Sequence, residues 1–266
     1  MAGSERIVWD EGMLLTPQHF QQLDRHLQGE LRRRTAMLLP RHWGVSTLVL
    51  DGEALRIGEL RLESVSGVLP SGLVFDAPRL DPLPPPRRFV EVFGPRADGL
   101  PVHLAMPTLR SGGTAVSDEG VEGNRPTPFL RRRVTIGDDA RPGAEREITV
   151  ALPNLRILFG GEVLDDYDRI QIAVVQRTDT GAFVLAPRFV PSCVHLTAAP
   201  VLQSLLRRVI EILSTRSEEL ASRQRHAGRR FEPSDRTRRV NRQLRRVCTQ
   251  QSIDRAGDGA LGECQH

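Results

Sequence analysis

Two histidines and two neighbouring carboxylates near the start of the chain are the candidate metal-binding or acid–base residues of this sequence. His19 and His26 are seven residues apart, with Glu30 close behind them. On a helix this spacing places both imidazoles on one face, but two turns separate them by about 10 Å. A zinc site needs at least three ligands around one point, and no H-E-x-x-H motif is present. We interpret the pair as a polar edge and expect no metal site.

Asp10 and Glu11 could act as paired carboxylates in acid–base catalysis. Adjacent residues of an extended segment point to opposite sides, however, and no nucleophile motif or glycine-rich phosphate loop accompanies them. We therefore expect no catalytic residue and no cofactor. We favour a structural role, in which Glu11 fixes the N-terminal segment as an ion-pair or hydrogen-bond partner, with Arg25 as the candidate partner.

A helix of about residues 17 to 38 must position these groups. Thr16 is a suitable N-cap, Pro17 a suitable first helical residue, and Pro40 marks the end. The apolar residues of this segment recur at three-, four- and seven-residue steps, which predicts one apolar stripe. The stripe consists of Phe20, Leu23, Leu27, Leu31 and Leu38.

Three large apolar residues around this helix start have two open interpretations. Trp9, Met13 and Phe20 are either core residues or hot-spot contacts for a partner protein. The sequence alone does not decide between them.

From Trp43 to about Pro191 the sequence changes to short runs of β-branched and aromatic residues, separated by glycine and proline. The turn at 179–181 predicts a hairpin, and 55–65 predicts a strand with a bulge or two short strands. Many short strands without long helices between them predict an antiparallel sandwich or barrel. We interpret the arginine run 131–133 as a solvated face, with an acidic partner surface as the alternative.

A second helix is predicted from Thr197, its N-cap, to about Arg225. Its apolar residues are spaced by four and three, as in a bundle or coiled coil, and Arg216 is the one flaw. A lone helix with so wide an apolar face needs partners, which are the sandwich, other helices or further copies of the chain. We favour self-association or a bundle through Leu202, Leu206, Val209, Leu213 and Leu220.

The net charge is concentrated at the end of the chain. Residues 227–266 hold nine arginines against five acids, which accounts for the whole net charge of +4 and leaves residues 1–226 neutral. A nucleic-acid-binding protein would be expected to show a basic face, so we expect no nucleic-acid partner. The segment 229–266 is rich in arginine and poor in apolar residues, which predicts disorder.

No segment has the pattern of a membrane-spanning helix or of a signal peptide. Cys193, Cys248 and Cys264 are few and widely spaced, which argues against a disulfide framework and against a zinc site of paired cysteines. The sequence therefore predicts a cytoplasmic protein of one to two domains.

The stretch from Trp9 to His26 resembles the opening signature of the TssK family, also called ImpJ or VasE, which supplies a baseplate subunit of bacterial type VI secretion systems. The family pattern is roughly W-x-E-G-M-x-L-x-P-Q-H-F-Q-x-x-(D/E)-R. Segments 69–75, 154–158, 189–193 and 200–213 also resemble family motifs, so the resemblance covers about residues 5–226. The residues that match the signature are Trp9, Glu11, Gly12, Met13, Leu15, Pro17, Gln18, His19, Phe20, Gln21, Asp24 and Arg25.

The resemblance implies an architecture and a role. Residues 1–191 should form a β-sandwich like the shoulder domain of phage receptor-binding proteins, and 192–228 the first helix of a helical-bundle, trimerising domain. The family is trimeric and has no known enzymatic activity. Its N-terminal domain contacts the wedge subunits TssF and TssG. Its C-terminal domain contacts the membrane-complex subunits TssL and TssM, which we expect here only if that domain is present.

We assign wedge docking to the start of the chain, where the signature lies. The residues assigned are Trp9, Glu11, Gly12, Met13, Pro17, Gln18, His19, Phe20 and Arg25.

The resemblance weakens after about residue 226. The sequence 231–235 still follows the family, but the apolar helix that should follow is absent, and we expect a truncation or a shifted reading frame. Two other classes remain open. One is a phage-tail-like sandwich that binds carbohydrate or a receptor, for which one tyrosine and two tryptophans are few; the other is a hydrolase, which no nucleophile–base motif supports. A non-functional, truncated gene product is the third possibility.

Overall fold

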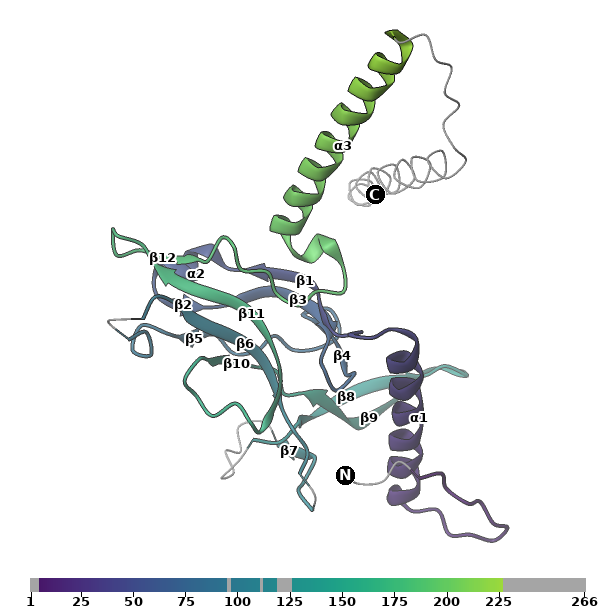
Figure 1. Ribbon diagram of the computed structural model, residues 1–266. Coiled ribbons are helices and arrows are strands. Elements are labelled where there is room, and N and C mark those ends of the chain that lie inside the picture. The colour runs from purple at the N-terminus through teal and green to yellow at the C-terminus, as the bar shows by residue number, and fades with distance from the viewer. Residues whose placement is uncertain (1–4, 95–96, 111, 119–125, 227–266) are drawn as a thin grey trace, which may run out of the picture. The chain divides into compact units, whose positions relative to one another are not determined.

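The structure is a computed structural model of the 266-residue chain, and it describes residues 5–94, 97–110, 112–118 and 126–226 (Figure 1). The chain divides into two compact units, residues 1–206 and 207–266. The first unit contains helix α1 (Pro17–Leu38) and all the described strands, and helix α3 (Pro200–His226) continues into the second. The predicted antiparallel β fold, preceded by one helix and followed by another, is confirmed.

Two antiparallel sheets share one core and form the body of the first unit. The first sheet has the order β1-β3-β4 and the second β10-β6-β11-β12. Val65 and Phe75 from the first sheet and Leu104, Ile157 and Ile170 from the second are all at most 1 % exposed and belong to the same apolar cluster. The strands are β1 (Gly44–Leu50), β3 (Leu62–Val68), β4 (Val74–Ala77), β6 (Leu100–Pro107), β10 (Arg156–Phe159), β11 (Tyr167–Arg177) and β12 (Phe183–Leu185).

Two smaller sheets complete the strand structure. Strands β2 (Glu59–Leu60) and β5 (Arg87–Arg88) form an antiparallel pair. Strands β7 (Val116–Asp118), β8 (Phe129–Asp138) and β9 (Arg141–Pro153) form a sheet in which β7 runs parallel and β9 antiparallel to β8.

Turn chemistry explains where the expected elements hold and where they do not. The expected hairpin at 179–181 is confirmed, because β11 and β12 pair across it. Leu55, in contrast, lies in the short helix α2 (Gly52–Arg56), because the Asp51 carboxylate accepts hydrogen bonds from the backbone N–H groups of Glu53 and Ala54 at 2.9 and 3.0 Å. The predicted cap Thr197 is also wrong, since it lies in the 3-10 helix η1 (Leu196–Ala198).

A half-buried ion pair ties β5 to the loop after β10. Arg87 donates to both carboxylate oxygens of Glu162 at 2.7 and 3.0 Å, and to the carbonyl of Ile157 at 2.8 Å. Glu162 also accepts from the backbone N–H of Phe159 at 2.8 Å, and the Arg87 guanidinium lies 4.8 Å from the Phe159 ring centre. Burial alone would raise the pKa of Glu162, but the hydrogen bonds from Arg87 and Phe159 outweigh it and lower the pKa.

We predict that Glu162→Gln lowers the free energy of unfolding by about 2 kcal/mol at neutral pH, because Arg87 loses a charged partner. A lowered folded-state pKa stabilises the fold above the ordinary glutamate pKa, and this contribution disappears as the pH falls through the folded-state value. Urea unfolding should therefore separate the two proteins at neutral pH and bring them together in acid. Glu63→Gln, at an exposed position of β3, is the control, and equal loss in both variants would contradict the assignment.

Candidate docking surface

A tight turn and an unusual cap fix the chain before α1. The backbone N–H of Met13 donates to the carbonyl of Asp10 at 3.3 Å, and Gly12 has φ +78°, which residues other than glycine rarely adopt. The backbone N–H of Thr16 donates to Nδ1 of His19 at 3.1 Å, and that of His19 donates to the carbonyl of Thr16 at 3.1 Å. His19 thus acts as the reciprocal partner of the N-cap and has a structural task.

Trp9 folds back over this cap. Its ring centre lies 6.3 Å from that of His19, with the two planes tilted by 35°. Trp9 nevertheless remains 51 % exposed, and Phe20, the first residue of the stripe, remains 56 % exposed. These exposures exclude the core interpretation for both side chains within this chain, while Met13 is half-buried.

Helix α1 meets the body through its polar face. Gly29 is the buried residue of the helix, and Nη1 of Arg32 donates to the carbonyl of Ser71 at 3.0 Å. A Cβ placed on Gly72 would lie 2.6 Å from Cγ of Arg32, and Gly72 has φ +86°, so another residue here would strain the turn and displace the Arg32 side chain. At 100° per residue, Gly29 lies opposite the apolar stripe. The stripe therefore points away from the body.

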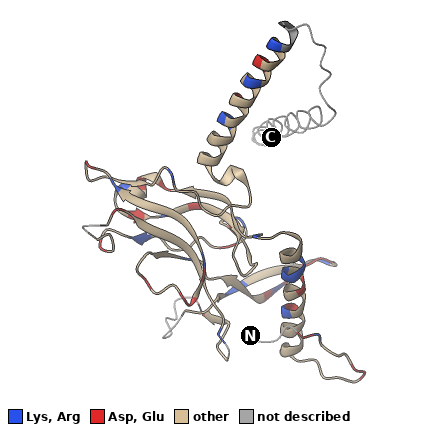
Figure 2. Cartoon of the chain, viewed as in Figure 1, with Lys and Arg blue, Asp and Glu red and all other residues tan. Residues whose placement is uncertain are grey.

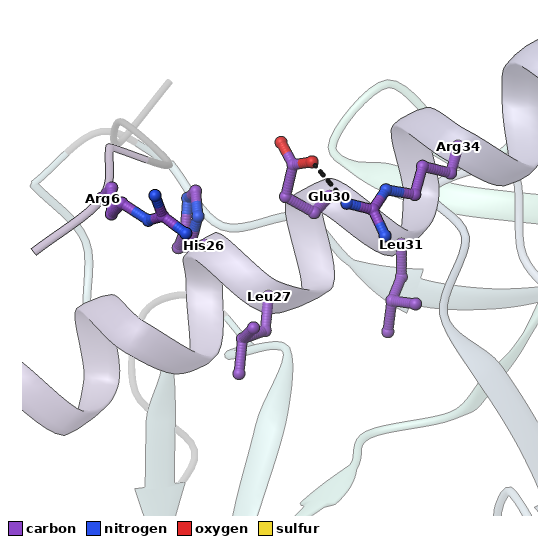
Figure 3. Close-up of a pocket in the computed structure, with 6 residues that line it drawn as sticks. All are labelled: Arg6, His26, Leu27, Glu30, Leu31 and Arg34. Atoms are coloured by element: carbon purple, nitrogen blue, oxygen red, sulfur yellow. Dashed lines mark ion pairs between the residues drawn. The ribbon is translucent and has the colours of Figure 1, made fainter.

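The exposed stripe and the N-terminal segment form a shallow groove (Figure 3). Ile7, Trp9, Leu23 and Leu27 line one part of it, and Leu31 continues it along the helix. Leu27 is 52 % and Leu31 64 % exposed. An exposed groove with apolar walls is typical of a protein-binding surface.

The rim of this groove is mostly basic. Arg6, His26 and Arg34 line it, and its one carboxylate, Glu30, forms ion pairs with Arg33 and, at 3.6 Å, with Arg34. The hydrogen bond from Arg33 lowers the pKa of Glu30. The arginines of α1, blue in Figure 2, begin at Arg25 and cluster at residues 32–34. The groove therefore suits a partner with apolar and acidic groups.

The structure brings the sequence-predicted docking residues together around the start of α1, but not with the pairing that we expected. Arg25 donates its Nε–H to the carbonyl of Gln21 at 3.2 Å, whereas Glu11 is exposed and forms no ion pair within the described residues. The expected Glu11–Arg25 ion pair is therefore wrong. Seven of the nine residues are exposed and two, Met13 and His19, are half-buried; the exposed ones are Trp9, Glu11, Gly12, Pro17, Gln18, Phe20 and Arg25.

Sequence reasoning missed part of the groove. Arg6 and Ile7 precede the signature and have no periodicity that would mark them. The sequence identifies Leu27 and Leu31 as stripe residues. It does not show that the helix buries its opposite face, at Gly29, and so leaves the stripe exposed. Within the described residues, no three His, Cys, Asp or Glu side chains come together as a metal site would require, and no helix there is long and apolar enough to cross a membrane.

Helix α3 carries a second uncovered stripe. Leu202 and Leu206 are half-buried, whereas Val209, Leu213 and Leu220 are exposed. Arg216, the polar residue in this stripe, donates to Glu219 at 2.9 Å. The described residues thus leave most of the apolar face of α3 without cover.

Comparison with known proteins shows to which family this chain belongs. A family model described as bacterial type VI secretion, EvfL, ImpJ and VasE, matches residues 19–246. The match runs past residue 226, where we placed the departure from the family. The type VI secretion system baseplate component TssK1 of Pseudomonas aeruginosa is 35 % identical over 227 residues, which are 84 % of this chain and 50 % of the relative. The chain thus spans about half the length of this curated relative.

Solved structures agree. The type VI TssK–TssF–TssG baseplate subcomplex, seen by cryo-electron microscopy, contains a chain 27 % identical with a TM-score of 0.74, covering 82 % of this chain and 72 % of that one. A chain of the type VI baseplate complex is 26 % identical with a TM-score of 0.74, covering 88 % and 72 %. A crystal structure of TssK, at 22 % identity and a TM-score of 0.73 over 99 % of this chain and 58 % of that one, shares the fold. The chain with the apolar-out helix α1 therefore belongs to the TssK family of type VI secretion proteins.

Proposed function

We propose that this protein is a structural subunit of a type VI secretion baseplate and that it docks on the wedge subunits TssF and TssG. Its role is binding rather than catalysis, on the cytoplasmic side of the machine. One observation carries the proposal: α1 presents its apolar stripe to solvent in a chain of the TssK family. A relative of this fold occurs in a TssK–TssF–TssG subcomplex, which supports the choice of partner.

We propose that docking uses the signature residues together with the groove. Trp9 and Phe20 supply large exposed apolar surface at the start of α1, and large aromatic side chains dominate the binding energy of many interfaces. Gly12 and His19 act by positioning, because the turn and the cap hold the segment on which Trp9 lies. We do not propose contact with TssL or TssM for the described residues.

The double variant Trp9→Ala/Phe20→Ala should weaken capture of co-expressed TssF–TssG by about 2 kcal/mol or more, because it removes the two largest exposed aromatic side chains of the proposed surface. Biolayer interferometry with immobilised wedge measures this. The matched control is Met37→Ala, which removes an 82 % exposed side chain from the same helix away from the stripe. Equal binding by the double variant and by the control would reject the proposed site.

We further propose that α3 mediates self-association through Leu202, Leu206, Val209, Leu213 and Leu220. Leu213→Glu should shift the chain towards monomer in sedimentation velocity, because burying a carboxylate in an apolar seam costs several kcal/mol. Ser214→Glu adds the same charge to the same helix outside the stripe and should leave the oligomer intact. An unchanged distribution for Leu213→Glu would assign the stripe another role.

A further inference from the structure

The hairpin of β8 and β9 is a long two-stranded ribbon. Its strands pair from Phe129 opposite Pro153 to Gly137 opposite Glu145, and β7 borders only the first three positions of β8. Figure 1 shows the two strands continuing together beyond β7. An isolated two-stranded ribbon is only marginally stable in water. The residues on its two faces therefore indicate what kind of surface it packs against.

The pairing register sorts the ribbon into a polar and an apolar face. Residues directly opposite each other point to the same side, and successive residues alternate between sides. One face is polar in its middle, where it holds Arg131, Arg133, Thr135, Glu145, Glu147 and Thr149, and its remaining positions are Phe129, Gly137, Ala151 and Pro153. The other is apolar apart from two arginines, Arg132 and Arg146, and consists otherwise of Leu130, Val134, Ile136, Ile148, Val150 and Leu152.

The apolar face is open within the described residues. Ile136 is 47 % and Ile148 40 % exposed. Val134, which lies opposite Ile148, and Val150, next to Ile148 on the same face of β9, are half-buried. Four β-branched side chains therefore form a continuous, partly exposed strip along both strands. Such a strip on a ribbon is typical of an interface.

The arginines on the two faces differ in their partners. On the polar face, Arg131 lies 3.4 Å from the Asp118 carboxylate and Arg133 lies 3.3 Å from that of Glu147. On the apolar face, Arg132 and Arg146 have no acidic partner among the described residues. Arg146 lies opposite Ile136, four residues along the strand from Arg132, so the Cα atoms of the two arginines are about 14 Å apart. An occupant of this face must offer apolar side chains and carboxylates that reach both arginines.

A second copy of this chain does not offer that chemistry on its other uncovered apolar surfaces. The α1 groove is rimmed by Arg6 and Arg34, and the α3 stripe contains Arg216. The carboxylates beside these two surfaces, Glu30 and Glu219, already pair with arginines of their own helices, so neither surface offers a free carboxylate to Arg132 or Arg146. The segment with Asp10 and Glu11 is acidic, but it belongs to the proposed docking surface.

We propose that the apolar face of the β8–β9 ribbon is a second wedge-binding surface, which holds an acidic, apolar segment of TssF or TssG through carboxylates on Arg132 and Arg146. This inference rests on the proposed docking to the wedge. It adds a contact remote in sequence from the signature.

The test is wedge binding by the full chain with charges reversed on one face at a time. Arg132→Glu/Arg146→Glu should weaken binding to purified TssF–TssG about tenfold or more, because the carboxylates would then meet like charges. Arg131→Glu/Arg133→Glu makes the same change on the polar face of the same ribbon and should stay close to wild type. Arg132→Ala/Arg146→Ala, the milder variant, should fall between them, and circular dichroism melting checks that every variant is folded.

The possible outcomes separate the two proposals. Wedge binding by wild type that both charge-reversed variants retain overturns the ribbon surface and leaves the proposed function standing. Altered sedimentation of Arg132→Glu/Arg146→Glu alone, with unchanged wedge binding, assigns the face to a second copy and also overturns it. Failure of the wild-type chain to bind TssF–TssG rejects the proposed function and, with it, this inference.

Discussion

The face on which α1 meets the body is the constraint on which the binding properties of this protein depend. Gly29 and Arg32 seat the helix against the turn at Ser71 and Gly72, and this contact uses the polar side of the helix. A helix of this amphipathicity would ordinarily bury its stripe in the core. Because the opposite side is seated, Phe20, Leu27 and Leu31 remain exposed among the described residues and are available to a binding partner.

The rest of the first unit supports that arrangement. The core shared by the two main sheets and the Arg87–Glu162 ion pair hold the body on which α1 rests. The turn at Gly12 and the cap formed by His19 hold Trp9 beside the helix start. These contacts do not assemble a reactive group, because the ring of His19 accepts a hydrogen bond from the backbone N–H of Thr16. The residues that stabilise the body are thus different from those of the proposed docking surface.

Local patterns were enough to predict α1, the antiparallel strands and the hairpin at 179–181, because period and turn chemistry act within a few residues. The helix at 52–56 was missed because the cap formed by Asp51 overrides the alternation of Leu55 and Ile57. The outward direction of the α1 stripe was not predictable, since it depends on Gly72, far away in the sequence. The amphipathic ribbon likewise needs the register of β8 and β9, which the sequence does not display.

Hydrogen–deuterium exchange of the full chain, with and without purified TssF–TssG, shows directly whether the wedge covers the start of α1. We expect the wedge to slow exchange in the segment before α1 and along the N-terminal half of α1, and to leave exchange in the β1–β3–β4 sheet unchanged. Slower exchange confined to other parts of the chain, with the segment around Trp9 and Phe20 unaffected, would contradict it.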